Sequence, residues 1–278
     1  MKCTICGNQN LELLTKELRN STGKVYFCSR CDLGFSDKPQ LETKEYYDKE
    51  YRKKFTDSLQ APDSKPQSMF NLRKEFQEDR LRIVRNYVDK RKKFLEIGCS
   101  AGQFLCHILD SFVECVGIEL DTECKKFVEE SLNIRVYDTE LKYCGFQGQP
   151  FDYVAAFQVL EHTMDPVGFL NDAKEIIKTD GKIFIEVPNL YDPLLALWDI
   201  KAYHQFYYHE AHTHYFSEKS LEKLAQKCGL IIEDIYFLQD YNVLNHVYWY
   251  FNNGPQEDCV GGLSKPRIDF PENNTEAG

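Results

Sequence analysis

The chain has 278 residues, of which 42% are hydrophobic and 28% charged, so the collagen-like, fibrous and disordered classes are excluded. Its 34 lysines and arginines against 44 aspartates and glutamates give a net charge of −10, which disfavours general nucleic-acid binding. There is no apolar run of about 18 residues and no signal-peptide core, so we expect no membrane association and a cytoplasmic location.

Two cysteine pairs stand near the start of the sequence, Cys3-x-x-Cys6 and Cys28-x-x-Cys31. Each C-x-x-C turn can aim two sulfurs at one point, and four thiolates match the tetrahedral ligand set that Zn²⁺ prefers. Four protein ligands leave no open coordination position, so we predict a structural zinc ion in a ribbon over residues 1–38. Four unrelated buried cysteines or a redox pair are the alternatives.

Residues 39–92 are predicted to form a helical connector. A charged, tyrosine-rich stretch without glycine or proline predicts a helix over 42–55, and apolar residues on one face predict another over 67–89. The first helix carries three tyrosines that could form a lid over a cofactor and substrate, or could simply pack on the following domain. These are Tyr46, Tyr47 and Tyr51.

From residue 93 onward, strand-like and helix-like segments alternate. The predicted strands cover residues 94–97, 113–120, 134–137, 151–157, 182–187, 230–238 and 243–251. The predicted helices cover residues 103–109, 122–132, 167–178 and 218–228, and the last ends at Gly229. We therefore expect an α/β fold with a doubly wound, seven-stranded, mostly parallel sheet over 93–252. Residues 253–278 are expected to form an extended tail.

A glycine turn follows the first of these strands. Glu96, Gly98 and Gly102 give an E-x-G-x-x-x-G pattern, in which the backbone can approach a nucleotide-like ligand closely. An acid two residues before the first glycine suits a ligand with a positively charged ammonium, whereas a pyrophosphate would be repelled. Glu119 ends the second strand, where an acid can accept hydrogen bonds from ribose hydroxyls.

This order of elements resembles the class I S-adenosylmethionine-dependent methyltransferases, which have a Rossmann-like fold. The resemblance covers about residues 93–251; Ser100 replaces the middle glycine of the usual first motif, and Glu161-His162 and Asp165-Pro166 match the region after the fourth strand. It implies S-adenosylmethionine as cofactor and S-adenosylhomocysteine as product. The implied cofactor-binding residues are Glu96, Gly98, Cys99, Ser100, Gly102, Gln103, Phe104, Glu119, Leu120, Asp138, Gln158 and Glu161.

Four of the seven histidines fall within residues 204–214, between the fifth strand and the next helix. In this fold such an insertion lies over the carboxyl ends of the strands, where substrates bind. A second metal site or an aromatic packing loop is the alternative interpretation. The segment resembles the Y-H-E-H-x-x-Y-F-S stretch of sugar C-methyltransferases, with His212 at the second histidine. However, Ala211 stands at the glutamate and His209 at the tyrosine.

Together with the ribbon, this pattern resembles methyltransferases that act on nucleotide-linked sugars. Because of the departure at Ala211, we predict methyl transfer to a hydroxyl of a small sugar-containing substrate rather than to carbon. A hydroxyl needs a base, and histidine has a pKa near the working pH. The candidates, in order, are His212, His162, and then His209 and His214.

Three other functions stay open: a sugar C-methyltransferase, an RNA or protein methyltransferase, and a non-catalytic cofactor-binding partner. Methyltransferases acting on base amino groups carry an N/D-P-P-Y-type tetrapeptide after the fourth strand, where this chain has Gln158-Val159-Leu160-Glu161. We expect no nucleic-acid partner, and a homodimer is possible.

Overall fold

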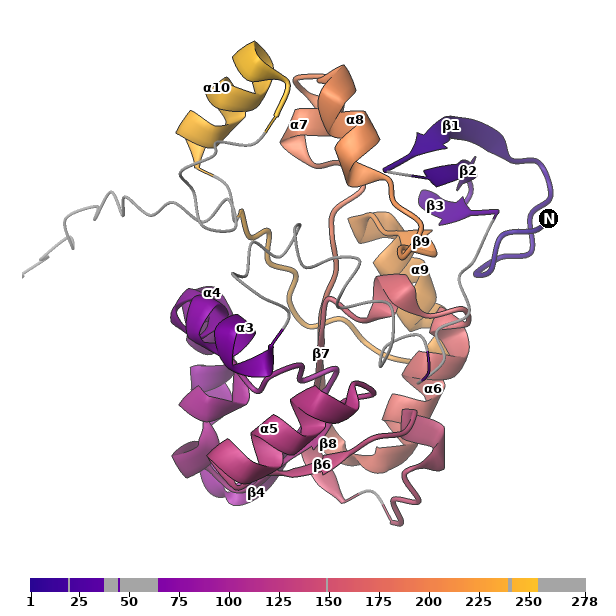
Figure 1. Ribbon diagram of the computed structural model, residues 1–278. Coiled ribbons are helices and arrows are strands. Elements are labelled where there is room, and N and C mark those ends of the chain that lie inside the picture. Colours follow the sequence, from indigo (N-terminus) through magenta and orange to yellow (C-terminus); the bar gives the residue numbers. More distant parts are fainter. Residues whose placement is uncertain (20, 38–44, 46–64, 149, 240–241, 255–278) are drawn as a thin grey trace, which may run out of the picture.

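The computed structural model describes residues 1–19, 21–37, 45, 65–148, 150–239 and 242–254. Their chain path forms a body built on a parallel sheet and, beside it, a ribbon with three short helices (Figure 1). The predicted tyrosine helix over 42–55, apart from residue 45, and nearly all of the predicted tail lie outside these residues.

The central sheet is parallel throughout and has the strand order β6-β5-β4-β7-β8. Relative to chain order this is 3-2-1-4-5, so the direction of winding reverses between β4 and β7. In such sheets the ligand crevice lies outside the carboxyl ends of the strands at that reversal. The strands are β4 (Asp89–Ile97), β5 (Phe112–Ile118), β6 (Arg135–Tyr137), β7 (Phe151–Phe157) and β8 (Ile177–Glu186).

Helices cover the sheet as a doubly wound fold requires. The longer ones are α5 (Thr122–Leu132), α6 (Pro166–Ile176) and α9 (Glu218–Cys228), and α9 ends at Gly229 in the left-handed conformation, as predicted. The predicted helix over 67–89 is two helices, α3 (Pro66–Arg73) and α4 (Glu78–Val84), separated by a 3-10 turn. Leu81 and Val84 pack in the core of the sheet body, so this part of the connector belongs to that body.

The described residues give the sheet five strands, not the predicted seven. Residues 230–238 have no ladder pairing; Glu233 forms an ion pair with Lys182 of β8. Residues 243–251 were wrongly predicted as a strand and form helix α10 (Val243–Asn252). Its buried residues Asn245 and Trp249 are four apart and so share one helical face. The predicted helix over 103–109 is a pair of 3-10 turns.

The ribbon shares a sheet with the histidine-rich segment. Its antiparallel strands β1 (Glu12–Leu18), β2 (Ser21–Cys28) and β3 (Leu33–Ser36) are joined by β9 (His214–Tyr215), which pairs with β3. The ribbon also shares a hydrophobic core with α6 and α9. That core contains Cys3, Cys28, Cys31, Leu33, Phe35, Leu160, Leu170, Phe216 and Leu224. The hydrophobic core therefore continues across the predicted domain boundary at residue 38.

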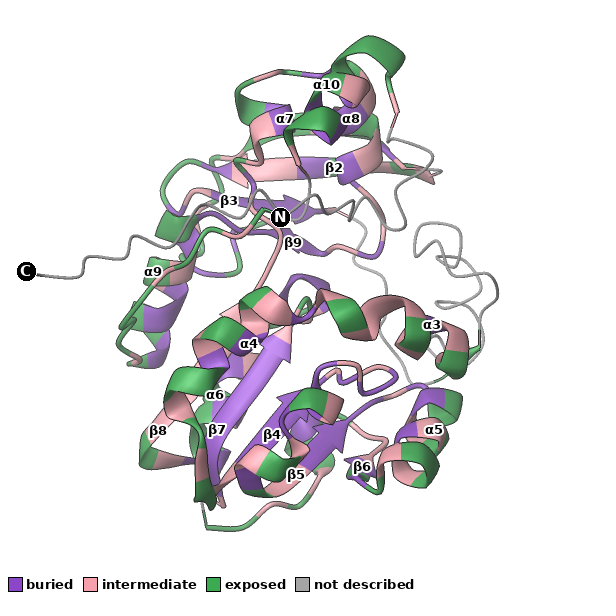
Figure 2. Cartoon of the chain, turned by 90° about the vertical axis from the view of Figure 1, so that its left-hand side faces the viewer, coloured by how far each residue is buried: buried purple, intermediate pink, exposed green. Residues whose placement is uncertain are grey.

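Three helices complete the ribbon side of the molecule: α7 (Pro193–Ala196), α8 (Lys201–Tyr207) and α10. Their aromatic residues pack with Leu18 and Val25 of the ribbon. Figure 2 shows the buried strands of the central sheet with their carboxyl ends directed toward this side. A large cleft is lined by residues of both parts.

Candidate functional site

The glycine turn after β4 forms one wall of the cleft. Gly98 has φ +72°, and a Cβ there would lie 2.5 Å from Cγ2 of Val159, so no larger residue fits without displacement. Ser100, at the place of the usual middle glycine, also has a left-handed φ of +48°. The backbone N–H groups of Gly98 and Cys99 both donate to the carbonyl of Ile118 on β5. The turn is thereby held against the second strand, with its outer side open to the cleft.

Two buried acids stand beside this turn. The Glu119 carboxylate accepts hydrogen bonds from the backbone N–H groups of Ser100 (2.7 Å) and Asp121 (2.8 Å), while burial raises its pKa to about 7. Glu96 ends β4, and burial raises its pKa to about 8. Its Oε2 has no hydrogen-bond partner among the described residues. An orphaned carboxylate oxygen on the cleft wall fits a ligand that brings a positively charged amino group.

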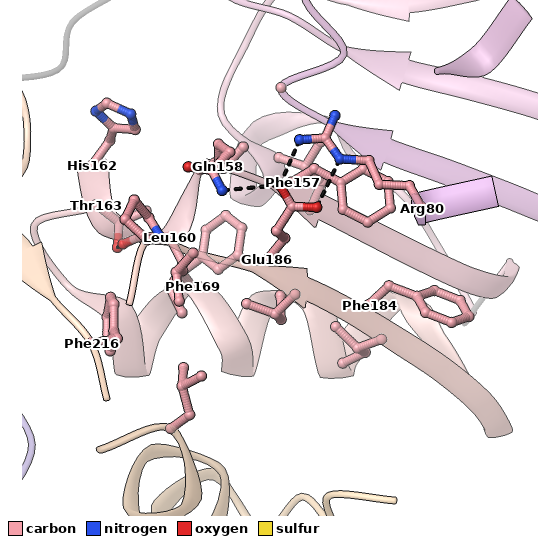
Figure 3. A pocket seen from close by; sticks show the side chains of 18 of the residues that line it. Arg80, Phe157, Gln158, Leu160, His162, Thr163, Phe169, Phe184, Glu186 and Phe216 are labelled. Atoms are coloured by element: carbon pink, nitrogen blue, oxygen red, sulfur yellow. Dashed lines mark hydrogen bonds and ion pairs between the residues drawn. The ribbon is translucent and has the colours of Figure 1, made fainter. Parts of the chain in front are cut away.

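A half-buried ion pair lies on the other side of the reversal point (Figure 3). Arg80 of α4 binds both oxygens of Glu186 at the end of β8, at 2.6 and 2.8 Å, and Gln158 donates to the same carboxylate at 2.9 Å. Burial alone would raise the pKa of Glu186, but the Arg80 bonds outweigh it and lower the pKa. We did not predict Arg80, because nothing in the charge pattern of its helix distinguishes it from its neighbours.

A group of histidines and one glutamate lies at the end of β7. His162 and His212 have ring centroids 4.9 Å apart, and the ring of His209 lies 3.7 Å from that of His212. Glu161 Oε1 is 3.9 Å from Nε2 of His162 and 4.0 Å from Nε2 of His212. Burial lowers the pKa of His162 to about 4 and raises that of Glu161 to about 8; it also lowers the pKa values of His209 and His212 well below their ordinary values. The histidines are therefore neutral at physiological pH.

Hydrogen bonds between distant segments assemble this group. The Thr213 N–H donates to the carbonyl of Glu161 at 2.8 Å, and the Thr213 hydroxyl donates to the carbonyl of Thr163 at 2.7 Å. His214 Nδ1 donates to the same Thr163 carbonyl, and its Nε2 bonds the Thr4 hydroxyl at 3.0 Å. His214 thus links the ribbon to the loop after β7, and it does not line the cleft.

The ribbon also contributes a cation to the cleft. Arg19, next to the end of β1, donates from Nε to the carbonyl of Phe206 at 2.6 Å, and its guanidinium lies 3.6 Å from the centroid of the Phe206 ring. Burial is the main cause that lowers the pKa of His209, and the positive charge of Arg19 is the second cause. We did not predict this residue, because its neighbours in the cleft are about 190 positions away along the chain.

Most of the predicted site residues meet in this one cleft. The exceptions among the cofactor residues are Gly102, which packs on Val128 and Leu132, and Phe104, which lies in the core. Asp138 instead forms an ion pair with Lys125, and Glu161 is not among the residues that line the cleft. The predicted residues that line the cleft are Glu96, Gly98, Cys99, Ser100, Gln103, Glu119, Leu120, Gln158, His162, His209 and His212.

The four ribbon cysteines converge on one point. Their Sγ atoms all lie within 4.8 Å of one another, and those of Cys6 and Cys28 are 3.7 Å apart. Each pair is folded into a tight turn, in which Gly7 N–H donates to the Cys3 carbonyl and Asp32 N–H to the Cys28 carbonyl. The donor set and its geometry fit a tetrahedral thiolate-bound ion.

Comparison with known proteins identifies the family of the sheet body. Residues 70–234 match the family described as a methyltransferase domain. The chain belongs to that family. A solved structure of an S-adenosylmethionine-dependent methyltransferase from Archaeoglobus fulgidus superposes with a TM-score of 0.52 at 21% identity, covering 62% of this chain and 75% of that one. The predicted class I methyltransferase is thus confirmed at the level of family and fold.

Sequence relatives of this methyltransferase include two ubiquinone biosynthesis O-methyltransferases. The one from Haemophilus ducreyi is 28% identical over 108 residues, which cover 35% of this chain and 46% of that protein. The one from Coxiella burnetii is 25% identical over 153 residues, which cover 51% and 63%. The chain therefore spans about half the length of the relatives it matches. No helix among the described residues is long and apolar enough to cross a membrane.

Proposed function

We propose that this methyltransferase transfers the methyl group of S-adenosylmethionine to a hydroxyl oxygen of a small molecule. The observation that supports this most is the shared cleft, which joins the glycine turn and its two acids to a group of neutral histidines. When bound, S-adenosylmethionine supplies an electrophilic methyl group on a sulfonium. In this proposal Glu96 receives the cofactor's ammonium group, and Glu119 accepts from its ribose hydroxyls.

The histidine group is proposed to receive the hydroxyl proton. A hydroxyl is a poor nucleophile at neutral pH, and a positioned base is worth about 10²–10⁴-fold in rate. His212 and His162 are the first candidates, since both line the cleft and both are neutral at physiological pH. Burial lowers their pKa values away from the expected value near the working pH, which makes each a weaker base than an exposed histidine. His209 lies against the ring of His212 and ranks behind them, whereas the position of His214 removes it from the proposal.

The first candidate acceptor is a sugar linked to a nucleotide. The Arg19 guanidinium at the cleft wall suits a phosphate, and aromatic residues that can stack on a sugar ring line the same cleft. These include Phe157, Phe184, Tyr203, Phe206 and Tyr207. The names of the relatives favour a second candidate, a hydroxyl on an aromatic ring of the kind found in ubiquinone biosynthesis.

Calorimetric titration of the protein saturated with S-adenosylhomocysteine can separate these acceptors. We expect nucleoside diphosphate sugars to bind in the micromolar to millimolar range and phenolic acids such as 3,4-dihydroxybenzoate to bind much more weakly. The reverse order would replace the sugar with the aromatic acceptor. Methyl transfer from labelled S-adenosylmethionine to the tighter binder then tests the reaction, and the absence of any oxygen-linked methyl product would refute it.

We also propose that Cys3, Cys6, Cys28 and Cys31 hold a structural zinc ion. The convergence of four sulfurs supports this, and Asn8 Nδ2 lies 3.7 Å from the Cys28 sulfur, where it can orient that ligand. Elemental analysis of protein purified without chelators should find about one zinc per chain. A zinc content near zero would contradict the assignment.

A further inference from the structure

We propose that Glu161, His162 and His212 hold a divalent transition-metal ion, and that the ion binds the acceptor oxygen. This inference rests on the proposed function, because it names what the histidine group does in that reaction. The three residues come from two loops about 50 positions apart, one after β7 and one before β9. The site is distinct from the ribbon cysteines, and two of its three residues, His162 and His212, line the cleft.

The spacing of the donor atoms supports an ion rather than direct hydrogen bonds. One donor atom from each residue lies within 4.8 Å of the other two. The distances from Glu161 Oε1 to the two Nε2 atoms, 3.9 and 4.0 Å, exceed the limit of about 3.2 Å for a hydrogen bond. Atoms that each lie about 2.1 Å from a common ion are about 3–4 Å apart. A small adjustment of these side chains would complete the coordination.

The burial of Glu161 supports the same conclusion. Its side chain is 1% exposed, and neither carboxylate oxygen has a hydrogen-bond partner among the described residues. Buried carboxylates are normally hydrogen-bonded, paired with a cation or coordinated to a metal. Arg80 is engaged by Glu186, and no other described cation forms an ion pair with Glu161 except the two histidines at 3.9–4.0 Å. A divalent ion between the three groups would satisfy this carboxylate.

The histidine orientation is also that of a metal ligand. His162 Nδ1 donates to the carbonyl of Ala211 at 2.9 Å, which leaves the lone pair on Nε2, the atom nearer Glu161. Metal-binding histidines typically have their second nitrogen held by a carbonyl or carboxylate in this way. Ala211 directly precedes His212, so the same bond also positions the loop that carries the other histidine.

Two histidines and one carboxylate leave coordination positions open, unlike the four cysteines of the ribbon. Because His162 and His212 line the cleft, an acceptor hydroxyl can reach such a position. A metal ion lowers the pKa of a bound hydroxyl, so its proton can pass to solvent. The oxygen then forms the new O–C bond while the S–C bond breaks and its electron pair stays on sulfur. In this arrangement His162 and His212 hold the ion, so activation of the hydroxyl by the ion replaces direct transfer of its proton to a histidine.

Titration of the zinc-loaded protein with Mn²⁺, followed by electron paramagnetic resonance of free Mn²⁺, tests the site directly. The wild-type chain should bind one Mn²⁺ beyond its ribbon metal. Glu161→Gln and His212→Asn should each weaken this binding by at least about tenfold. His204→Asn is the matched control: it removes a histidine from the same segment that is 37% exposed and bonded to Asp199, and should leave Mn²⁺ binding unchanged.

Unchanged affinity for S-adenosylhomocysteine would establish that each variant is folded. The inference is overturned if the wild type binds neither Mn²⁺ nor a second Zn²⁺, or if the two site variants bind as the wild type does. It is also overturned if methyl transfer persists in the presence of a chelator, because Glu161 would then be a buried, protonated acid and not a metal ligand. None of these results contradicts the proposed methyl transfer, which fails only if the protein does not methylate an oxygen acceptor.

Discussion

The glycine turn after β4 and the histidine group after β7 both line one cleft, but different kinds of contact hold them in place. The turn depends mainly on residues close in sequence: Gly98 and Ser100 supply left-handed backbone, and the Ile118 carbonyl on the adjacent strand accepts from the N–H groups of Gly98 and Cys99. The histidine group depends on partners about 50 positions apart, such as Thr213 with Glu161. A local motif therefore identifies the cofactor side, whereas the acceptor side exists only once the chain is folded.

The ribbon adds to this difference between the glycine turn and the histidine group. It supplies β3 to pair with β9, Thr4 to bond His214, and Arg19 to line the cleft. The acceptor side therefore depends on a segment that is almost 200 residues away in sequence, and the glycine turn makes no comparable use of the ribbon. Substitutions in the two regions should consequently give different patterns of loss.

The largest effect is expected from the ribbon metal. Cys28→Ser removes one of four thiolates, and because the ribbon core continues into α6 and α9, the loss should extend to the loop that carries His212. We expect the melting temperature to fall by at least about 10 °C, with loss of bound zinc. Differential scanning calorimetry and elemental analysis measure this. Cys115→Ser, a thiol outside the ribbon, is the control.

If the ribbon unfolds while the sheet body and the histidine group stay intact, the ribbon is an independent module. Hydrogen exchange measured at residues 209–216 distinguishes the two outcomes, because β9 should lose protection only when its pairing with β3 is lost.

The next effect concerns turnover. His212→Asn keeps a similar side-chain volume and should lower turnover by about 10²–10⁴-fold while leaving the affinity for S-adenosylhomocysteine unchanged. Single-turnover kinetics with the acceptor selected by calorimetry measure the loss. His204→Asn should retain activity. Near-normal turnover of His212→Asn together with an inactive His162→Asn would move the essential histidine to the loop after β7.

Glu119→Ala should instead weaken the binding of the cofactor. It removes a buried charged acceptor, at a cost of about 1.5–3 kcal/mol per charge-assisted bond, which corresponds to roughly 10–150-fold weaker cofactor binding. Part of this loss would come from the Ser100 and Asp121 N–H groups that the carboxylate now holds. Glu119→Gln, which keeps the shape, should lose less. Calorimetry with S-adenosylhomocysteine decides, and unchanged affinity in Glu119→Ala would mean that another acid binds the ribose.

The smallest effect is a dependence of stability on pH. Burial raises the pKa of Glu96 to about 8 and that of Glu119 to about 7, against an ordinary value of 4.5. Between pH 6.5 and 8 these two acids bind more protons in the folded protein than in the unfolded chain, so their contribution to the free energy of unfolding should fall as the pH rises. The contribution of Glu96 is at most about 1.4 kcal/mol per pH unit, or about 3 °C in melting temperature.

Thermal melts of the protein without cofactor over this range measure that slope, and Glu96→Gln should make it shallower. The buried histidines act in the opposite direction in the lower part of this range. His162, with its pKa lowered to about 4 from 6.5, binds fewer protons in the folded protein than in the unfolded chain up to about pH 7.5, and this contribution cancels when the slopes of wild type and Glu96→Gln are compared. A slope that is identical in wild type and variant would show that Glu96 is ionised throughout.

Several elements follow directly from local sequence. Helix α5, strand β7 and helix α9 have the predicted bounds, and Gly229 ends α9 in the left-handed conformation. Apolar periodicity and terminal turn residues are properties of neighbouring positions, so one sequence suffices to recognise them. The apolar run at 243–251 shows the limit of this reasoning. Such a run is compatible with a strand or a helix, and its packing partners in the folded chain determine which of the two forms.

The amino-acid sequence by itself determined the alternation of strands and helices, the glycine turn with its acids, and the four cysteines able to meet at one point. Each of these rests on spacing along the chain. Tertiary structure alone decided that β9 joins the ribbon, that Arg19 and Arg80 reach the cleft, and that Glu161 lies between two histidines. These contacts depend on which strand edges pair and which charges are buried together, and such pairings are not encoded in any short stretch of sequence.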